Sequence, residues 1–118
     1  MIRFFESLKI AFNGIWLAFK SEPNFRIQIF VGALVVFLMF FFQVTSLEKA
    51  VLSIVILLVL SLEMINTQIE KSLDLIQPAL DPKVKLIKDI SAGAVLISAM
   101  GALIAGIIVF YPYFNPYG

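Results

Sequence analysis

Hydrophobic and polar residues alternate with helical periodicity at the start of the chain. Within residues 2–20, six large apolar residues recur at spacings of three and four, with charged and amide residues between them: Phe5, Leu8, Phe12, Ile15, Trp16 and Phe19. This spacing gathers them on one face and predicts an amphipathic helix. Beside long apolar segments, such a helix is expected to lie in the membrane interface, with Trp16 at the headgroup boundary, rather than to pack on soluble protein.

Three long apolar segments follow, and each can cross a hydrocarbon core of about 30 Å as a helix. The predicted spans are residues 27–44, 47–76 and 89–110. Pro23 favours the start of the first span, Ser46 is a candidate N-cap of the second, and prolines mark a loop over residues 77–82. An aromatic and proline group is expected to anchor the third span in the interface and stop its helix: Tyr111, Pro112, Tyr113, Pro116 and Tyr117.

The composition fits this pattern and narrows the chemistry. Of 118 residues, 61% are hydrophobic and only 14% are charged, which predicts an all-α integral membrane protein with a single domain over residues 1–118. The absence of cysteine and histidine excludes thiolate and imidazole chemistry. A net charge of +1 argues against a nucleic-acid partner, because neutralising many backbone phosphates requires a stripe of basic residues.

The basic residues predict the orientation in the membrane. Lys49 alone lies in the first connection, whereas the other basic residues fall on the side of the N-terminus and the second connection: Arg3, Lys9, Lys20, Arg26, Lys71, Lys83, Lys85 and Lys88. The positive-inside tendency places the N-terminus in the cytoplasm and the C-terminus outside. The polar end of the second span then faces the cytosol.

That polar end carries the candidate chemistry. Glu63, Asn66, Glu70 and Asp74 fall within a helical stripe about 80° wide. Carboxylates near lipid are costly unless they meet a partner, a cation or a watery cavity, so the stripe indicates function. Glu63 and Glu70 are about 10 Å apart along a helix, too far to act on one atom, which favours two roles.

The two roles fit phosphoryl transfer. Glu70, with Asp74 or Glu22, could hold Mg²⁺, which takes one or two carboxylates plus phosphate oxygens and water. Glu63 lies deeper in the apolar segment, where a desolvated carboxylate can accept a proton from an alcohol. Lys88 is a candidate phosphate partner, and positioning with charge neutralisation supplies most of such catalysis.

Other interpretations of the stripe stay open at this level. The acids could form an interhelical polar network, line the pathway of a small transporter or ion-conducting bundle, or belong to a structural membrane subunit. Lys83 and Lys85 are most simply topology signals and lipid-phosphate contacts. The chain has no GxxxxGK or GxGxxG run, so an ATP enzyme here would be of an unusual kind.

Four segments together resemble the signature of the prokaryotic diacylglycerol kinase family, which includes the undecaprenol kinases. They are residues 11–15 (AFNGI), 22–26 (EPNFR), 63–74 (EMINTQIEKSLD) and 88–96 (KDISAGAVL). The resemblance extends from about Ser7 to Gly106. It implies an N-terminal surface helix and three transmembrane helices.

The resemblance also implies an activity and a catalytic centre. A homotrimer in the bacterial inner membrane would move the γ-phosphoryl of MgATP to a lipid hydroxyl. Glu63 would be the general base, Glu22 and Glu70 the metal-binding carboxylates, and Asn66 would sit beside the transferred group. The 22–26 run resembles the undecaprenol kinase branch more than the diacylglycerol branch.

Nucleotide contacts follow in the same way. Lys88 and Asp89 would contact the nucleotide, and Arg3 would also reach ATP, with sites shared between subunits. Gln68 stands where a small residue is usual, and Asp81 stands where the family often has a histidine near the nucleotide. Neither departure touches the principal carboxylates.

Overall fold

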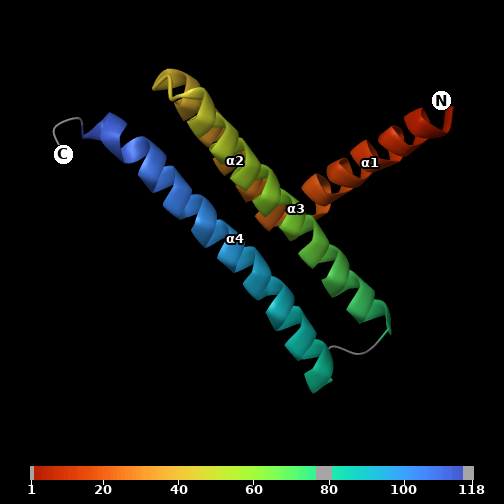
Figure 1. Ribbon diagram of the computed structural model, residues 1–118. Helices are drawn as coiled ribbons and strands as arrows, with labels where there is room; N and C mark the ends of the chain where they lie inside the picture. Colours follow the sequence, from red (N-terminus) through yellow and green to blue (C-terminus); the bar gives the residue numbers. More distant parts are fainter. Residues whose placement is uncertain (1, 77–80, 116–118) are drawn as a thin grey trace.

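Four helices make up the computed structural model, which describes residues 2–76 and 81–115. They are α1 (Ile2–Ser21), α2 (Pro23–Phe41), α3 (Ser46–Ile76) and α4 (Pro82–Phe114). Helices α2, α3 and α4 run side by side, whereas α1 projects across their direction (Figure 1). Each of the three long helices is long and apolar enough to cross a membrane. The predicted all-α fold, with an amphipathic helix and three transmembrane helices, is confirmed.

Proline sets two helix starts. Pro23 occupies the first turn of α2, and Pro82 that of α4. The N-cap of α4 is Asp81, whose carboxylate accepts a hydrogen bond from the backbone N–H of Lys83 at 2.8 Å. Helix α4 therefore begins seven residues before the predicted start at residue 89, because a capped turn carries the basic residues into the helix. Residues 77–80 of the predicted loop lie outside the described residues.

The turn between α2 and α3 differs from its prediction. Helix α2 ends at Phe41, and Gln43 adopts a left-handed φ of 52°, so the first span stops before residue 44. Ser46 is not the cap of α3. Thr45 takes this position: its hydroxyl oxygen accepts from the N–H of Glu48 at 3.1 Å, and the Glu48 carboxylate accepts from the N–H of Thr45 at 3.0 Å. This reciprocal pair is a capping box.

The predicted stop at Pro112 is also wrong, since α4 continues through it to Phe114. Proline removes one backbone donor, but two contacts hold the last turn. The N–H of Asn115 donates to the Tyr111 carbonyl at 3.0 Å, and the Tyr113 hydroxyl donates to Glu48 Oε1 at 2.8 Å. The other expected anchor residues, 116 and 117, lie outside the described residues.

The apolar core lies where the end of α4 meets the turn between α2 and α3, an end that we call the tip (residues 38–52 and 109–114). Its buried side chains are Met39, Val44, Leu52, Val109 and Phe110. The Phe42 ring packs on Phe110, Tyr113 and Phe114. Large apolar side chains are exposed along the rest of the long helices, as expected of helices that face lipid.

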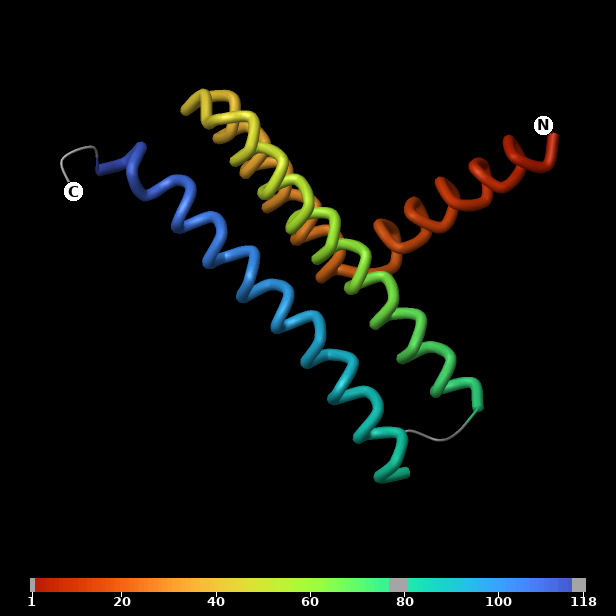
Figure 2. The backbone as a smooth tube through the Cα atoms, viewed as in Figure 1, coloured from red at the N-terminus to blue at the C-terminus, as the bar shows by residue number. Residues whose placement is uncertain are grey.

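At the opposite end, α3 and α4 extend beyond the corner at which α1 joins α2 (Figure 2). Closer to the middle of the bundle, Gly32 allows α2 to approach α3, because a Cβ atom there would lie 3.0 Å from Cγ2 of Ile56. The close approach brings polar residues of α2 within reach of the α3 stripe.

Candidate active site

The polar face of α3 turns toward the neighbouring helices. Glu63 and Asn66 are among the buried residues of α3, with 5% and 9% of their surface exposed. One turn further on, Glu70 Oε1 accepts a hydrogen bond from Nδ2 of Asn66 at 3.4 Å. Asp74 ends the face in an ion pair with Lys88 of α4. The side chains that the sequence predicts to share one face therefore meet partners on it.

Glu63 is held from α2. Nε2 of Gln28 donates to its Oε2 over 3.4 Å, longer than the usual range for an N–H···O hydrogen bond. The charges of Glu70 and Glu22 also act on the Glu63 carboxyl group. A buried carboxyl group held by one long hydrogen bond keeps an oxygen free for a ligand, so it is a candidate proton acceptor.

Two amide oxygens beside this carboxyl group are buried without a hydrogen-bond partner: Oε1 of Gln28 and Oδ1 of Asn66. Buried acceptors are normally satisfied, because each unpaired one costs about 1–3 kcal/mol. Gln28 donates a hydrogen bond to Glu63, and Asn66 lies three residues after Glu63 on the same face of α3. The group thus offers three acceptors to a ligand that carries a hydroxyl.

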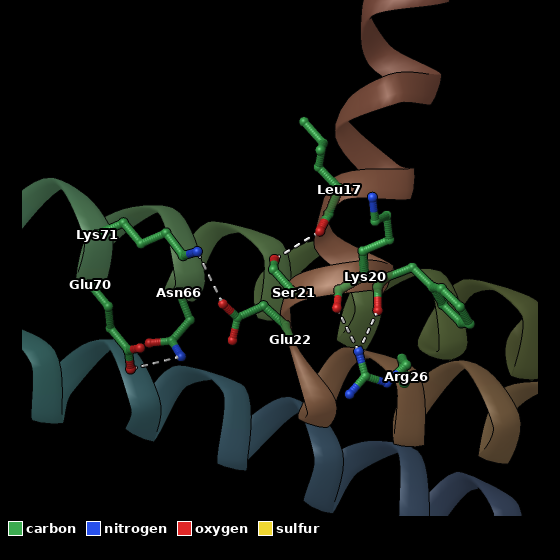
Figure 3. Close-up of polar contacts among 9 residues, drawn as sticks. Leu17, Lys20, Ser21, Glu22, Arg26, Asn66, Glu70 and Lys71 are labelled. Carbon is green, nitrogen blue, oxygen red and sulfur yellow. Dashed lines mark hydrogen bonds and ion pairs between the residues drawn. The ribbon is translucent and has the colours of Figure 1, made fainter.

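Glu22 stands at the corner between α1 and α2, and Arg26 fixes that corner. Nη1 of Arg26 donates to the carbonyls of Phe19 and Lys20 at 2.8 Å each, which satisfies the end of α1 (Figure 3). The Glu22 carboxylate then reaches toward α3, where its Oε1 lies 3.4 Å from Nζ of Lys71.

The remaining predicted residues lie further from this group. Nζ of Lys88 is 2.6 Å from Asp74 Oδ1, and Nζ of Lys85 is 2.6 Å from Asp89 Oδ2, on the part of α3 and α4 beyond the α1 corner. Arg3 lies near the free end of α1, which points away from the long helices (Figure 1). Within one chain the structure gathers Glu22, Glu63, Asn66 and Glu70, and leaves Arg3 apart.

Two grooves adjoin the site. A groove of about 600 Å³ runs between α2, α3 and α4 and is almost entirely apolar, but Gln28 contributes to its lining. A second groove of about 510 Å³ lies between α1 and α3 and has a more polar lining, including Ser21, Thr67, Gln68 and Lys71. Gln28, the partner of Glu63, therefore lines the apolar groove, and Lys71, the partner of Glu22, lines the groove that has more polar residues.

The carboxylates of the site could bind Mg²⁺ only if phosphate oxygens and water supplied the other ligands. In residues 2–76 and 81–115, no three carboxylates come together as a ready metal site. Two carboxylates, Glu22 and Glu70, match the one or two that Mg²⁺ takes when phosphate oxygens and water complete its shell. In this structure the Glu22 carboxylate is paired with the ammonium group of Lys71.

Three contact residues escaped prediction from the sequence. Gln28 was recognisable as a polar residue in an apolar run, but its partner lies 35 residues away. Arg26 counted toward topology and as part of the 22–26 run, and Lys71 counted toward topology and as part of the 63–74 run. Their roles depend on where helices cross, which periodicity does not specify.

Membrane-length helices around a buried carboxylate and amide group define a small integral-membrane protein with a polar site inside its helical bundle. Residues 9–110 match the family model described as prokaryotic diacylglycerol kinase. An undecaprenol kinase from Bacillus subtilis is 34% identical over 110 residues, which cover 93% of this chain and 89% of the relative. A diacylglycerol kinase from Synechocystis is 36% identical over 101 residues, or 85% of this chain and 58% of that longer relative.

The chain therefore belongs to the prokaryotic diacylglycerol kinase family, and it is a membrane-embedded lipid kinase. The family resemblance noted in the sequence is confirmed. An enzyme of this class requires a phosphate donor, a lipid acceptor and a bacterial membrane around its helices.

Proposed function

We propose that the chain transfers the γ-phosphoryl group of ATP, bound with Mg²⁺, to the hydroxyl of undecaprenol or diacylglycerol. The observation that carries this proposal is the buried Glu63 carboxyl group, flanked by unpaired oxygens of Gln28 and Asn66. Acceptors in such a place suit a hydroxyl donor. Membership of a lipid kinase family supports the reaction class.

Glu63 would act on the lipid hydroxyl as the general base. Gln28 holds one carboxylate oxygen through its amide N–H, so the other oxygen is available to the hydroxyl proton. Gln28 would thus keep the carboxylate of Glu63 oriented toward the hydroxyl. Asn66, which donates a hydrogen bond to Glu70, would lie between the lipid hydroxyl and the phosphate groups of the nucleotide.

Glu22 and Glu70 would hold the metal. When bound, Mg²⁺ would neutralise the charge that develops on the transferred phosphoryl group. Glu70 accepts from Asn66 and is therefore oriented before the nucleotide arrives. Arg26 fixes the corner that carries Glu22, so both carboxylates have supporting contacts.

The apolar groove between α2, α3 and α4 would take part of the hydrocarbon chain of the lipid. Its polar lining residue Gln28 lies beside the proposed base, which matches a long apolar molecule with one hydroxyl end. We favour undecaprenol over diacylglycerol. The supporting observations are the 22–26 run and a relative named undecaprenol kinase that matches 93% of the chain.

Nucleotide binding would extend beyond the four central residues. Lys88 and Asp89 would contact the nucleotide, which requires them to exchange their present partners, Asp74 and Lys85. Arg3 lies too far along α1 to serve the site of its own chain. A homotrimer with shared sites would bring it to the nucleotide of a neighbouring subunit.

The topology that fits this chemistry has a cytoplasmic N-terminus and an outer C-terminus in the bacterial cytoplasmic membrane. Eight of the nine basic residues then lie on the cytosolic side, where ATP is present.

The test is transfer of ³²P from [γ-³²P]ATP to undecaprenol or diacylglycerol in mixed micelles, with and without Mg²⁺. Glu63→Gln should lower kcat on the order of 10²–10⁴-fold, the contribution of a positioned base. Gln28→Leu should lower it about tenfold, because it removes an orienting contact but keeps the base. Glu6→Gln, on the exposed surface of α1, is the matched control and should leave kcat unchanged.

Transfer that Glu63→Gln leaves intact would contradict the assignment of the base. Cation flux in liposomes without ATP, lost in Glu63→Gln, would favour an ion-conducting bundle instead. Equal kcat/KM for the two lipids would refute the preference for undecaprenol.

A further inference from the structure

Lys71 joins α3 to the corner between α1 and α2. It directly follows Glu70 along α3, and its Nζ lies 3.4 Å from Oε1 of Glu22 (Figure 3). About 60% of the Lys71 side chain is exposed, against 24% for Glu22. An ion pair with one partner in solvent is weak and exchanges easily.

We propose that Lys71 is a further binding residue for the polyphosphate of the donor, held at Glu22 until a divalent cation arrives. The metal replaces the ammonium group on the Glu22 carboxylate. The released ammonium group then contacts phosphate oxygens of the same metal–nucleotide complex. This inference rests on the proposed metal role of Glu22 and goes beyond the residues assigned above.

The charges around the site favour this exchange. Glu22 and Glu70, the proposed metal carboxylates, are acidic side chains beside the place where a polyphosphate is to bind, so basic side chains are favoured there in addition to the metal. In the described part of the chain, the ion pair of Lys71 is the longest of three, at 3.4 Å against 2.6 Å for those of Lys85 and Lys88. Lys71 is the most readily released of these cations.

The position of Lys71 also gives the released group a place to act. Its side chain lines the open groove of about 510 Å³ between α1 and α3, together with the hydroxyl-bearing residues Ser21 and Thr67. A lysine ammonium group on a flexible four-carbon stem can swing between two oxygen partners without movement of the backbone. The exchange therefore needs no change in the fold.

The experiment compares metal binding with nucleotide binding in one set of variants. Binding of Mn²⁺ alone is measured by electron paramagnetic resonance, and binding of MgATP by the shift in thermal stability, both on the full chain in detergent. In Lys71→Gln, the Kd for Mn²⁺ should fall about two- to fivefold, the range of a solvent-exposed ion pair. The Kd for MgATP should rise about five- to tenfold.

Two further variants serve as controls. Lys71→Arg keeps the charge and should leave the Kd for MgATP within about twofold of the wild-type value. Lys9→Gln removes an exposed charge on α1 and should change neither constant.

Opposite signs for the two ligands are the signature of the exchange. A purely structural contact would weaken both bindings in Lys71→Gln, and that result overturns the proposal, as does an unchanged Kd for either ligand. A wild-type chain that binds neither Mn²⁺ nor MgATP also overturns it. Neither measurement needs lipid phosphorylation, so opposite shifts without kinase activity would refute the proposed function and leave the role of Lys71 standing.

Discussion

The contact between Arg26 and the end of α1 gives a prediction whose size follows from the structure. Nη1 of Arg26 donates to the carbonyls of Phe19 and Lys20, each at 2.8 Å. These carbonyls belong to the last turn of α1, where a cation is favourable. The contact to Phe19 is partly buried and that to Lys20 is exposed, so their joint loss should cost about 2 kcal/mol rather than the sum of two full charged hydrogen bonds.

Arg26→Met keeps most of the apolar stem and removes both contacts. A loss of about 2 kcal/mol raises the open population of the α1 corner about 30-fold. Hydrogen–deuterium exchange in lipid nanodiscs should therefore be about 30 times faster for amides in the last two turns of α1, with little change in α3 and α4. Affinity for Mn²⁺ should also fall, because the corner positions Glu22.

The matched control is Lys9→Met, which removes a cation from the middle of the same helix. Its α1 amides should exchange at the wild-type rate. If Arg26→Met leaves exchange in α1 unchanged, the corner does not depend on this side chain, and the argument for a fixed Glu22 fails.

Two further predictions concern the packing of the long helices. Gly32→Ala should be less stable than Gly101→Ala by about 1–2 kcal/mol in thermal denaturation, because the new Cβ meets Cγ2 of Ile56 at 3.0 Å whereas Gly101 has open space. Equal stabilities would show that α2 and α3 do not approach this closely. Tyr113→Phe should lower Tm more than Tyr111→Phe does, since only Tyr113 donates a hydrogen bond to Glu48 across the tip; the reverse order would contradict the account of the last turn of α4.

Much of the fold followed from the sequence, since helical periodicity and apolar length are local properties. The same reasoning put Glu63, Asn66, Glu70 and Asp74 on one face, and the structure agrees. The predictions that were wrong concern helix ends, which depend on the side chains that contact them. Ser46 was expected to cap α3, but the capping box needs the side chain of Glu48 and selects the preceding threonine.

Contacts between distant residues were beyond local patterns. Gln28 of α2 contacts Glu63, which lies 35 residues away in the sequence, and Lys71 of α3 contacts Glu22 between α1 and α2. Both depend on the crossing of helices, which Gly32 permits and no periodicity encodes. Pro112 was overestimated as a stop because the tertiary contacts of Tyr113 and Phe110 hold the turn around it.

The tip holds the cluster of buried apolar side chains, and Glu63, Asn66 and Glu70 lie further along α3. The apolar cluster that holds the helices together is thus separate from the candidate active site. A substitution beside Glu63 therefore removes little of the packing between the helices. With this separation, the lipid alcohol that is accepted as substrate can change in evolution while the helical fold stays the same. Stabilising substitutions at the tip should likewise leave kcat unchanged.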